Sequence, residues 1–150
     1  MNTFIAKVIN IEPGEIVSYI QVQSAQEKIR IIKSTLPQWL SVGDKVECKI
    51  HEASVCVSKE CPGLVSIENR LKANLKEVRC SDSLCELTFE SEMGEIVSLI
   101  TQLAYDELGL EMECEATILM RGVDISVEPY IDVLDTLELH KAISRIKDAN

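Results

Sequence analysis

Short runs in which apolar and polar residues alternate recur along the whole chain. Apolar residues at positions 85, 87 and 89 alternate with polar residues at 86, 88 and 90, and the segments 46–50 and 114–118 repeat the pattern. A period of two is typical of a β-strand with one buried face. Turn-forming pairs such as Pro13-Gly14 and Gly43-Asp44 separate the runs. The pattern predicts an all-β protein built from short strands.

The apolar pattern occurs twice. At an offset of 67 residues, the segment 2–11 aligns with 69–78, and Asn2 then meets Asn69. One residue is gained in the following loop, and at an offset of 68 Ile50 meets Ile118. Few residues are identical, but the apolar positions agree almost throughout. We therefore predict two tandem copies of one small module.

Each copy contains five short strand-like runs in about sixty residues. We expect each copy to close into a small barrel, because closure removes exposed strand edges. A short helical turn is expected between the third and fourth strands, over 36–40 in one copy and 103–108 in the other. After Pro129 the pattern changes: Asp135 and Glu138 have the spacing expected of a capping box, and apolar residues follow at helical spacing. The predicted units are a first barrel (1–62), a second barrel (65–128) and a C-terminal helical extension (129–150).

Charge and the length of the apolar runs argue against nucleic acid and membrane as partners. The net charge is −10, and residues 66–150 carry the whole excess with eighteen acidic against eight basic side chains. Nucleic-acid binding depends largely on Lys and Arg, so we expect no nucleic-acid ligand. No apolar run approaches the roughly 18 residues of a membrane span, and the N-terminus has no signal pattern. We expect a cytoplasmic protein with no membrane insertion.

The chain has six cysteines and two histidines. No Cys-x-x-Cys pair occurs, and the pairs Cys56/Cys61 and Cys80/Cys85 give only a weak zinc signal. Cys48 and Cys114 alternate with apolar neighbours and read as core residues of strands. We predict free, reduced thiols and no metal cofactor.

A family resemblance rests on motifs in the second copy. The segment 66–72, Ser-Ile-Glu-Asn-Arg-Leu-Lys, resembles the S-A-R-N-x-L-K pattern that opens a molybdate-binding Mop, or TOBE, module. Ile100-Thr101 followed by Leu108-Gly109-Leu110 resembles that family's I-T-x-x-S-x-x-x-L-G-L. The chain is similar to di-Mop, molbindin-like proteins over residues 2–128. The resemblance implies a pair of OB-like five-stranded barrels, often with a strand exchanged between modules or subunits.

The resemblance also implies a ligand, molybdate or tungstate, bound at interfaces between modules by backbone N–H groups, hydroxyls and a lysine. The family's donors come from the S-A-R-N turn and from an I-K-A-S segment near the end of each module. The candidate oxyanion-binding residues are Ser66, Ile67, Asn69, Lys72, His51 and Thr101.

The sequence departs from the family pattern at several of these positions. Glu68 replaces the arginine of the turn, and Ala104 replaces the serine that follows Thr101. For I-K-A-S, the first copy has the segment 50–53, with His51 for lysine and Ala53 for serine. The second copy has the segment 118–121 at this place, where Leu119 stands for lysine. Each lost donor to a charged ligand weakens binding by roughly 1.5–3 kcal/mol.

Two functions follow from these observations. The first is intracellular binding of a molybdate or tungstate oxyanion for transport, storage or sensing, in a homo-oligomer. The alternative is a TOBE-like regulatory or assembly module that has lost the oxyanion site and binds a protein partner. We expect no enzyme, because no nucleophile, base and orienting group come together in the sequence.

Overall fold

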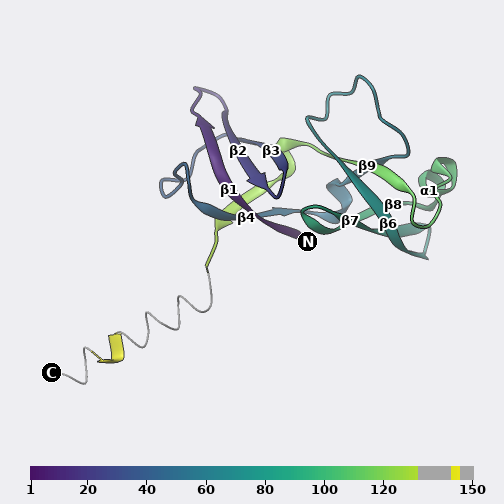
Figure 1. Cartoon of the computed structure of the whole chain (residues 1–150). Coiled ribbons are helices and arrows are strands. Elements are labelled where there is room, and N and C mark those ends of the chain that lie inside the picture. The colour runs from purple at the N-terminus through teal and green to yellow at the C-terminus, as the bar shows by residue number, and fades with distance from the viewer. Residues whose placement is uncertain (132–142, 146–150) are drawn as a thin grey trace.

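The computed structural model describes residues 1–131 and 143–145. Its strands form two five-stranded antiparallel sheets, which make up two lobes lying side by side (Figure 1). The first sheet has the order β10 (Ser126–Pro129), β4 (Lys45–Ile50), β1 (Asn2–Glu12), β2 (Ser18–Ser24) and β3 (Glu27–Lys33). The second has the order β5 (Cys56–Ser58), β9 (Glu115–Met120), β6 (Asn69–Ser81), β7 (Leu84–Ser91) and β8 (Gly94–Thr101). The predicted all-β class of two five-stranded units is confirmed.

The two halves of the chain exchange their last strands. β5 follows the first four strands in sequence but pairs with β9 of the second sheet, where Val57 lies opposite Ile118. In return β10 pairs with β4 of the first sheet, where Val127 lies opposite Cys48. Each sheet therefore takes four strands from one half and its fifth from the other. The predicted module boundaries at 62 and 65 remain a prediction about sequence units, whereas the hydrogen-bonded sheets cross them.

The pairing register of the strands shows which residues of the two halves are equivalent, and it corrects one part of the alignment predicted from the sequence. Phe4 lies opposite Cys48 in the first sheet, and Leu71 lies opposite Ile118 in the second. The offset is thus 67 for β1 and β6 but 70 for β4 and β9. The predicted offset of 68 for the later strands was wrong, and Ile50 corresponds to Met120 rather than to Ile118. Alternating apolar residues on β4 and β9 made a shift of two residues invisible in the pattern.

The three extra residues lie in the loop before the fourth strand. In the second half this loop contains α1 (Gln102–Leu108), which the Thr101 side chain caps at its start and Gly109 ends in a left-handed conformation. The predicted helical segment 103–108 is confirmed. The predicted turn of helix at 36–40 is wrong, because this segment contains a single hydrogen-bonded turn, closed by the Leu40 N–H and the Pro37 carbonyl, and no helix. Pro37 removes one backbone donor from that segment.

Both long strands begin with one buried, apolar face. On β1, Phe4, Ala6 and Val8 are buried and the residues between them are exposed, and β6 repeats the pattern with Leu71, Ala73 and Leu75. After the last buried residue each strand has a register irregularity, between Val8 and Asn10 and between Leu75 and Glu77. Such bulges increase strand twist, which suits a curled sheet. The repeat is therefore visible in local irregularities as well as in the strand order.

The thiol prediction was wrong for one pair. Cys80 and Cys85 lie opposite each other at the end of the β6–β7 hairpin and form a disulfide. The two-residue turn between them, Asp82-Ser83, has positive φ at both positions, as tight hairpins require. The pattern gave no register for this hairpin, so the facing thiols were not recognised. Four cysteines are free: Cys48 is buried, Cys114 is half-buried, and Cys56 and Cys61 are exposed.

The C-terminal extension lies mostly outside the described residues, as does most of its predicted helix, although residues 143–145 are helical. Within the described parts of the chain, no three His, Cys, Asp or Glu side chains come together as a metal site. None of the helices in those parts has the length and apolar character of a membrane span.

Candidate functional site

Two polar junctions connect the halves of the molecule, and each is built on an asparagine at the start of a long strand. The Asn69 amide donates to the Arg30 carbonyl on β3 at 2.8 Å and accepts from the Arg30 N–H at 2.7 Å. Asn2 makes the same pair of bonds with the backbone of Val97 on β8, at 2.7 and 2.8 Å. Arg30 and Val97 are separated by the repeat offset of 67, so the two junctions are equivalent positions in the two halves.

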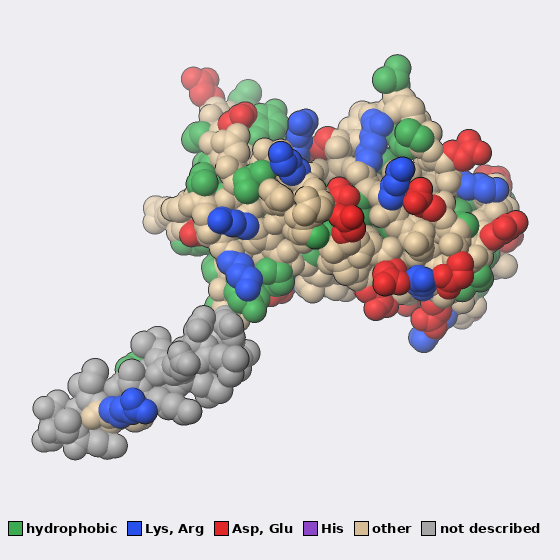
Figure 2. All heavy atoms as spheres, in the orientation of Figure 1, with side chains coloured by type: hydrophobic (Ala, Val, Ile, Leu, Met, Phe, Trp, Pro, Cys, Tyr) green, Lys and Arg blue, Asp and Glu red, His purple; other side chains and the backbone are tan. Residues whose placement is uncertain are grey.

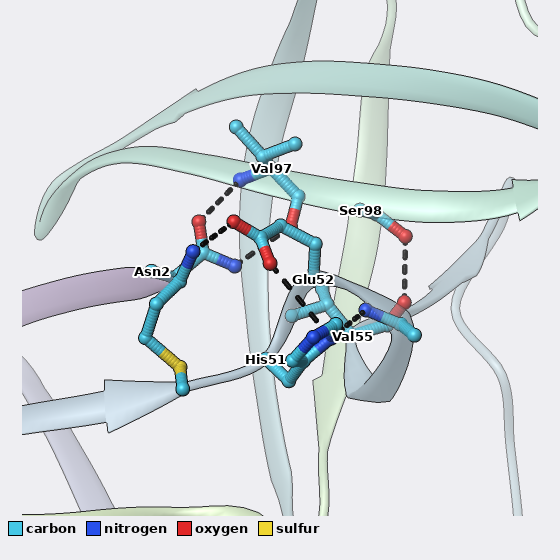
Figure 3. A network of polar contacts seen from close by, with 8 residues as sticks. Asn2, His51, Glu52, Val55, Val97 and Ser98 are labelled. Carbon is cyan, nitrogen blue, oxygen red and sulfur yellow. Dashed lines mark hydrogen bonds and ion pairs between the residues drawn. The ribbon is translucent and has the colours of Figure 1, made fainter.

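A short 3₁₀ turn completes each junction. η2 (Gly122–Asp124) follows β9 and packs against β3, whereas η1 (Glu52–Ser54) follows β4 and packs against β8. The first junction consists of Asn2, η1 and β8. The second junction consists of Asn69, η2 and β3. Both lie where segments from the two halves of the chain meet, and Figure 3 shows the first of them from close by.

At the second junction a carboxylate already accepts a hydrogen bond from the backbone. Oε1 of Glu68 accepts from the N–H of Gly122, the first residue of η2. The fit is close: a Cβ at Gly122 would lie 2.7 Å from this oxygen and 2.7 Å from the Arg30 carbonyl oxygen. Only glycine fits here. In this contact a backbone donor holds a carboxylate oxygen at the junction.

The first junction has its carboxylate on the turn itself (Figure 3). Glu52 pairs with the N-terminal ammonium of Met1, and its second oxygen lies 3.8 Å from Nδ1 of His51. The bond from the ammonium, and then the backbone N–H of Glu52 itself, hold the pKa of this carboxyl below its ordinary value. In the same junction the Ser98 hydroxyl donates to the Val55 carbonyl at 2.6 Å. The second junction has Ile31 at the position equivalent to Ser98.

The two carboxylates occupy exchanged positions in the repeat. Glu68 precedes Asn69, and the residue at that position in the first half is Met1. Glu52 is the first residue of η1, and the equivalent residue of η2 is Gly122. Each junction thus contains one carboxylate beside the first residue of a 3₁₀ turn, supplied from a different segment.

Three of the predicted site residues lie at or beside the second junction. Asn69 is buried, but its amide is fully engaged with Arg30, so it holds the two halves together. Ser66 is exposed, and its hydroxyl has no hydrogen-bond partner among the residues that the structure describes. Ile67 is half-buried, and its carbonyl accepts from Arg70. The Arg70 guanidinium also binds the carbonyls of Gly63 and Val65, and this fixes the linker that carries Ser66.

The other three predicted residues are not brought together with them. His51 lies at the first junction, where its Nδ1 accepts from the Ala53 N–H at 3.1 Å. Because Nδ1 is an acceptor, the ring proton is on Nε2, which remains able to donate. Thr101 caps α1 by accepting from the Ala104 N–H. Lys72 is exposed on β6 with Nζ 3.9 Å from a Glu115 oxygen.

The residue of the second half that is equivalent to His51 lies two positions later than the sequence alignment predicted. His51 precedes η1 and Arg121 precedes η2, so Arg121 stands at the position of the family's I-K-A-S lysine. The earlier match of Leu119 to that lysine was wrong, since Leu119 is a buried residue on β9 that lies opposite Arg70. The Arg121 side chain is 60% exposed and bonds to Asp124 at 2.9 Å. The basic residue is visible in the sequence, but the alignment set it two residues past the lysine position.

Charge is distributed unevenly over the surface. On the face shown in Figure 2, acidic side chains gather over the lobe that contains β6 to β9. A cavity of about 310 Å³ beside the linker is lined by Lys59, Arg70 and Lys72, but also by Glu60 and Glu115. Because Arg70 is engaged with three carbonyls, this cavity offers an anion less free charge than its composition suggests.

Comparison with known proteins supports the fold. No family model and no curated protein matches the chain. Among solved structures, the chain is similar to ModG, a cytoplasmic molybdate-binding protein whose structure contains bound molybdate. The two are 21% identical, the TM-score is 0.80, and the match covers 86% of this chain and 96% of that chain. The likeness shows a common fold, the pair of OB-like units predicted from the sequence.

Proposed function

We propose that the chain is a binding protein of the tandem Mop type that takes up a tetrahedral oxyanion, molybdate or tungstate, at the two junctions. The observation that carries the proposal is the bond between the Glu68 carboxylate and the Gly122 N–H, since it puts an anionic oxygen on a backbone donor where the halves meet. The fold of a molybdate-binding protein supports the same ligand.

The donors available to such an anion differ between the junctions. At the first junction they are the Nε2–H of His51 and the N-terminal ammonium of Met1, which here pairs with the Glu52 carboxylate. At the second they are the Gly122 N–H, the Arg121 guanidinium and, on the adjoining linker, the Ser66 hydroxyl and the Ile67 N–H. Backbone and side-chain donors of this kind hold a dianion without a metal counterion.

Thermal unfolding with added oxyanion tests this proposal. A ligand at a hundredfold excess over its Kd stabilises the folded state by about 2.7 kcal/mol. For a chain of this size we expect molybdate to raise the melting temperature by about 5–10 °C. Sulfate, which has shorter bonds, should raise it less. An unchanged melting temperature in millimolar molybdate and in millimolar tungstate would contradict the proposal.

Two conservative variants assign the binding to the junctions. His51→Asn keeps an acceptor for the Ala53 N–H but loses the reach of Nε2, and Arg121→Gln removes the cation of the second junction. We expect each variant to reduce the molybdate shift and the double variant to abolish it. Ser66→Ala should reduce the shift by removing one hydroxyl. Ser34→Ala, which changes an exposed serine at a bend of the first half, serves as the matched control and should leave the shift unchanged.

The alternative function is a TOBE-like regulatory or assembly module that binds a protein partner without an oxyanion. One observation favours it: the Asn69 amide, Nδ1 of His51 and the Thr101 hydroxyl are all engaged in internal bonds. Its acidic surface suits a basic partner (Figure 2). Failure of both oxyanions in the thermal test would favour this function.

We further propose that the protein works in the cytoplasm as a homo-oligomer, in transport, storage or sensing of the oxyanion. The resemblance to a family whose sites lie at interfaces between modules supports such an assembly, most simply a dimer with two-fold symmetry. Light scattering that finds only a 16.8 kDa species at micromolar concentration would contradict this part of the proposal.

A further inference from the structure

Glu68 lies at the second junction in an arrangement that the fold does not require. Its Oε1 accepts from the Gly122 N–H, although the residue as a whole remains exposed to solvent. The side chain belongs to the linker before β6, so it can rotate away without disturbing a strand. Asn69 holds β6 to β3 through its own two bonds and does not depend on Glu68. The carboxylate is therefore a removable occupant of the junction.

The space that the Glu68 carboxylate oxygen occupies beside Gly122 is small. Gly122 has no side chain, and a Cβ there would lie 2.7 Å from both the Glu68 oxygen and the Arg30 carbonyl oxygen, and 3.3 Å from Ile32. Space beside the Gly122 N–H is thus limited, and the Glu68 oxygen takes it. An external anion that uses the same N–H must first replace this oxygen.

The carboxylate of the first junction has cationic partners close to it, whereas the carboxylate of the second junction has none among the described residues. Glu52 faces the Met1 ammonium and lies near His51. Within the described chain, no Lys, Arg or His side chain lies within ion-pair distance of Glu68, and Arg121 is paired with Asp124 instead. A negative charge without a cationic partner repels a second anion brought close to it. The two junctions are therefore electrostatically unequal.

We infer that Glu68 is a built-in competitor, whose carboxylate occupies the oxyanion position of the second junction and lowers the affinity of that junction for an external oxyanion. The inference rests on the proposed function and deepens it. It makes the first junction the tighter site and gives the chain a second site that fills only at higher oxyanion concentration. Glu68 controls the difference between the two.

Calorimetric titration with sodium molybdate tests the inference on the full chain and three variants. Glu68→Gln keeps an acceptor for the Gly122 N–H but removes the charge, and Glu68→Ala removes both the charge and the acceptor. Glu60→Gln removes the same charge from the same linker and is the matched control. Circular dichroism confirms that each variant is folded.

We expect both Glu68 variants to bind molybdate about tenfold more tightly at the second site, so that a second equivalent appears in the titration. Glu60→Gln should behave as the unchanged chain. Binding by the Glu68 variants alone would support the competitor and contradict the proposed function of the natural chain. Binding by the natural chain with no change in either Glu68 variant would overturn the competitor alone. Binding by none of the proteins would overturn both.

Discussion

Cys48 shows how burial converts a small side chain into a pH-dependent contribution to stability. Its thiol lies on β4 inside the first sheet and is fully enclosed. Burial raises the pKa of this thiol from 9.0 to about 12, with the Lys33 ammonium opposing the rise and the Glu47 carboxylate adding to it. At neutral pH the group is a neutral apolar residue of the core.

The expected result is a loss of stability in alkali. Above pH 9 the unfolded chain loses the Cys48 proton while the folded chain keeps it, so the contribution is complete below pH 9 and falls as pH rises towards 12. Between pH 8 and pH 10 the free energy of unfolding should fall by about 1.4 kcal/mol more in the natural chain than in Cys48→Ala. Urea denaturation at the two pH values measures this difference. Equal losses in the two proteins would contradict it. Cys56→Ala, which replaces an exposed thiol, is the control and should keep the full loss.

At the residue scale, the sequence identified the right segments but not the roles of their residues. Asn69 and Asn2 were paired correctly by the repeat, yet the Asn69 amide binds Arg30 instead of waiting for a ligand. The role of the Asn69 amide depends on which backbone segment lies opposite it, and this cannot be predicted from a single sequence. Glu68 was seen as a departure from the family, but its contact with Gly122 links residues 54 apart in the chain.

At the element scale, the asparagine bonds stand in for strand pairing. β3 and β8 are the last strands of their sheets. Each presents one N–H and one carbonyl to an asparagine from a strand of the other sheet. Both bonds replace those that an edge strand otherwise makes with water or a further strand. The asparagines therefore close the structure at two places without adding strands.

Removing one of these asparagines should destabilise the fold measurably. Asn69→Ala deletes two hydrogen bonds and leaves the partly buried Arg30 N–H and carbonyl without their protein partners. Each bond contributes about 0.5–1.5 kcal/mol, so we expect a loss of roughly 1–3 kcal/mol in the free energy of unfolding. Urea denaturation measures it. Asn74→Ala, on the exposed face of the same strand, should change stability by no more than about 0.5 kcal/mol. Similar losses for the two variants would show that the Asn69 bonds add nothing specific.

Strands were predicted correctly where the alternation of apolar and polar residues was strong. The predictions were wrong where loop structure or the register between paired strands determines the result. The period of two identified strands on both copies, and the buried alternation on β1 and β6 follows it. The loops gave no such signal, which is why 36–40 was expected to match 103–108 although only the second forms a helix. Register across β4 and β9 was misplaced because a shift of two residues keeps every apolar residue on the same face.

At the scale of the whole molecule, exchange of β5 and β10 makes each half depend on the other. β5 supplies the edge beside β9, and β10 supplies the edge beside β4. Ile125 and Val55, which precede the exchanged strands, are buried in the core. A half that keeps its own four strands therefore lacks the fifth strand of its sheet and leaves apolar surface uncovered.

Cleavage of the linker tests this dependence. Leu64 lies at the tip of the linker and is fully exposed, so a protease recognition site inserted there is open to attack. After cleavage the two fragments should remain together in gel filtration under native conditions and separate only in denaturant, because the exchanged strands and both asparagine bonds still connect them. When expressed alone, the fragments 1–64 and 65–150 should each lack cooperative unfolding, and mixing them should restore it. A chain cut within the exposed β2–β3 turn at Ala25, where no strand is exchanged, is the comparison for the effect of a break as such. If the fragments cut at Leu64 separate in native buffer and each unfolds cooperatively, the two sequence copies are independent modules and the strand exchange does not hold the molecule together.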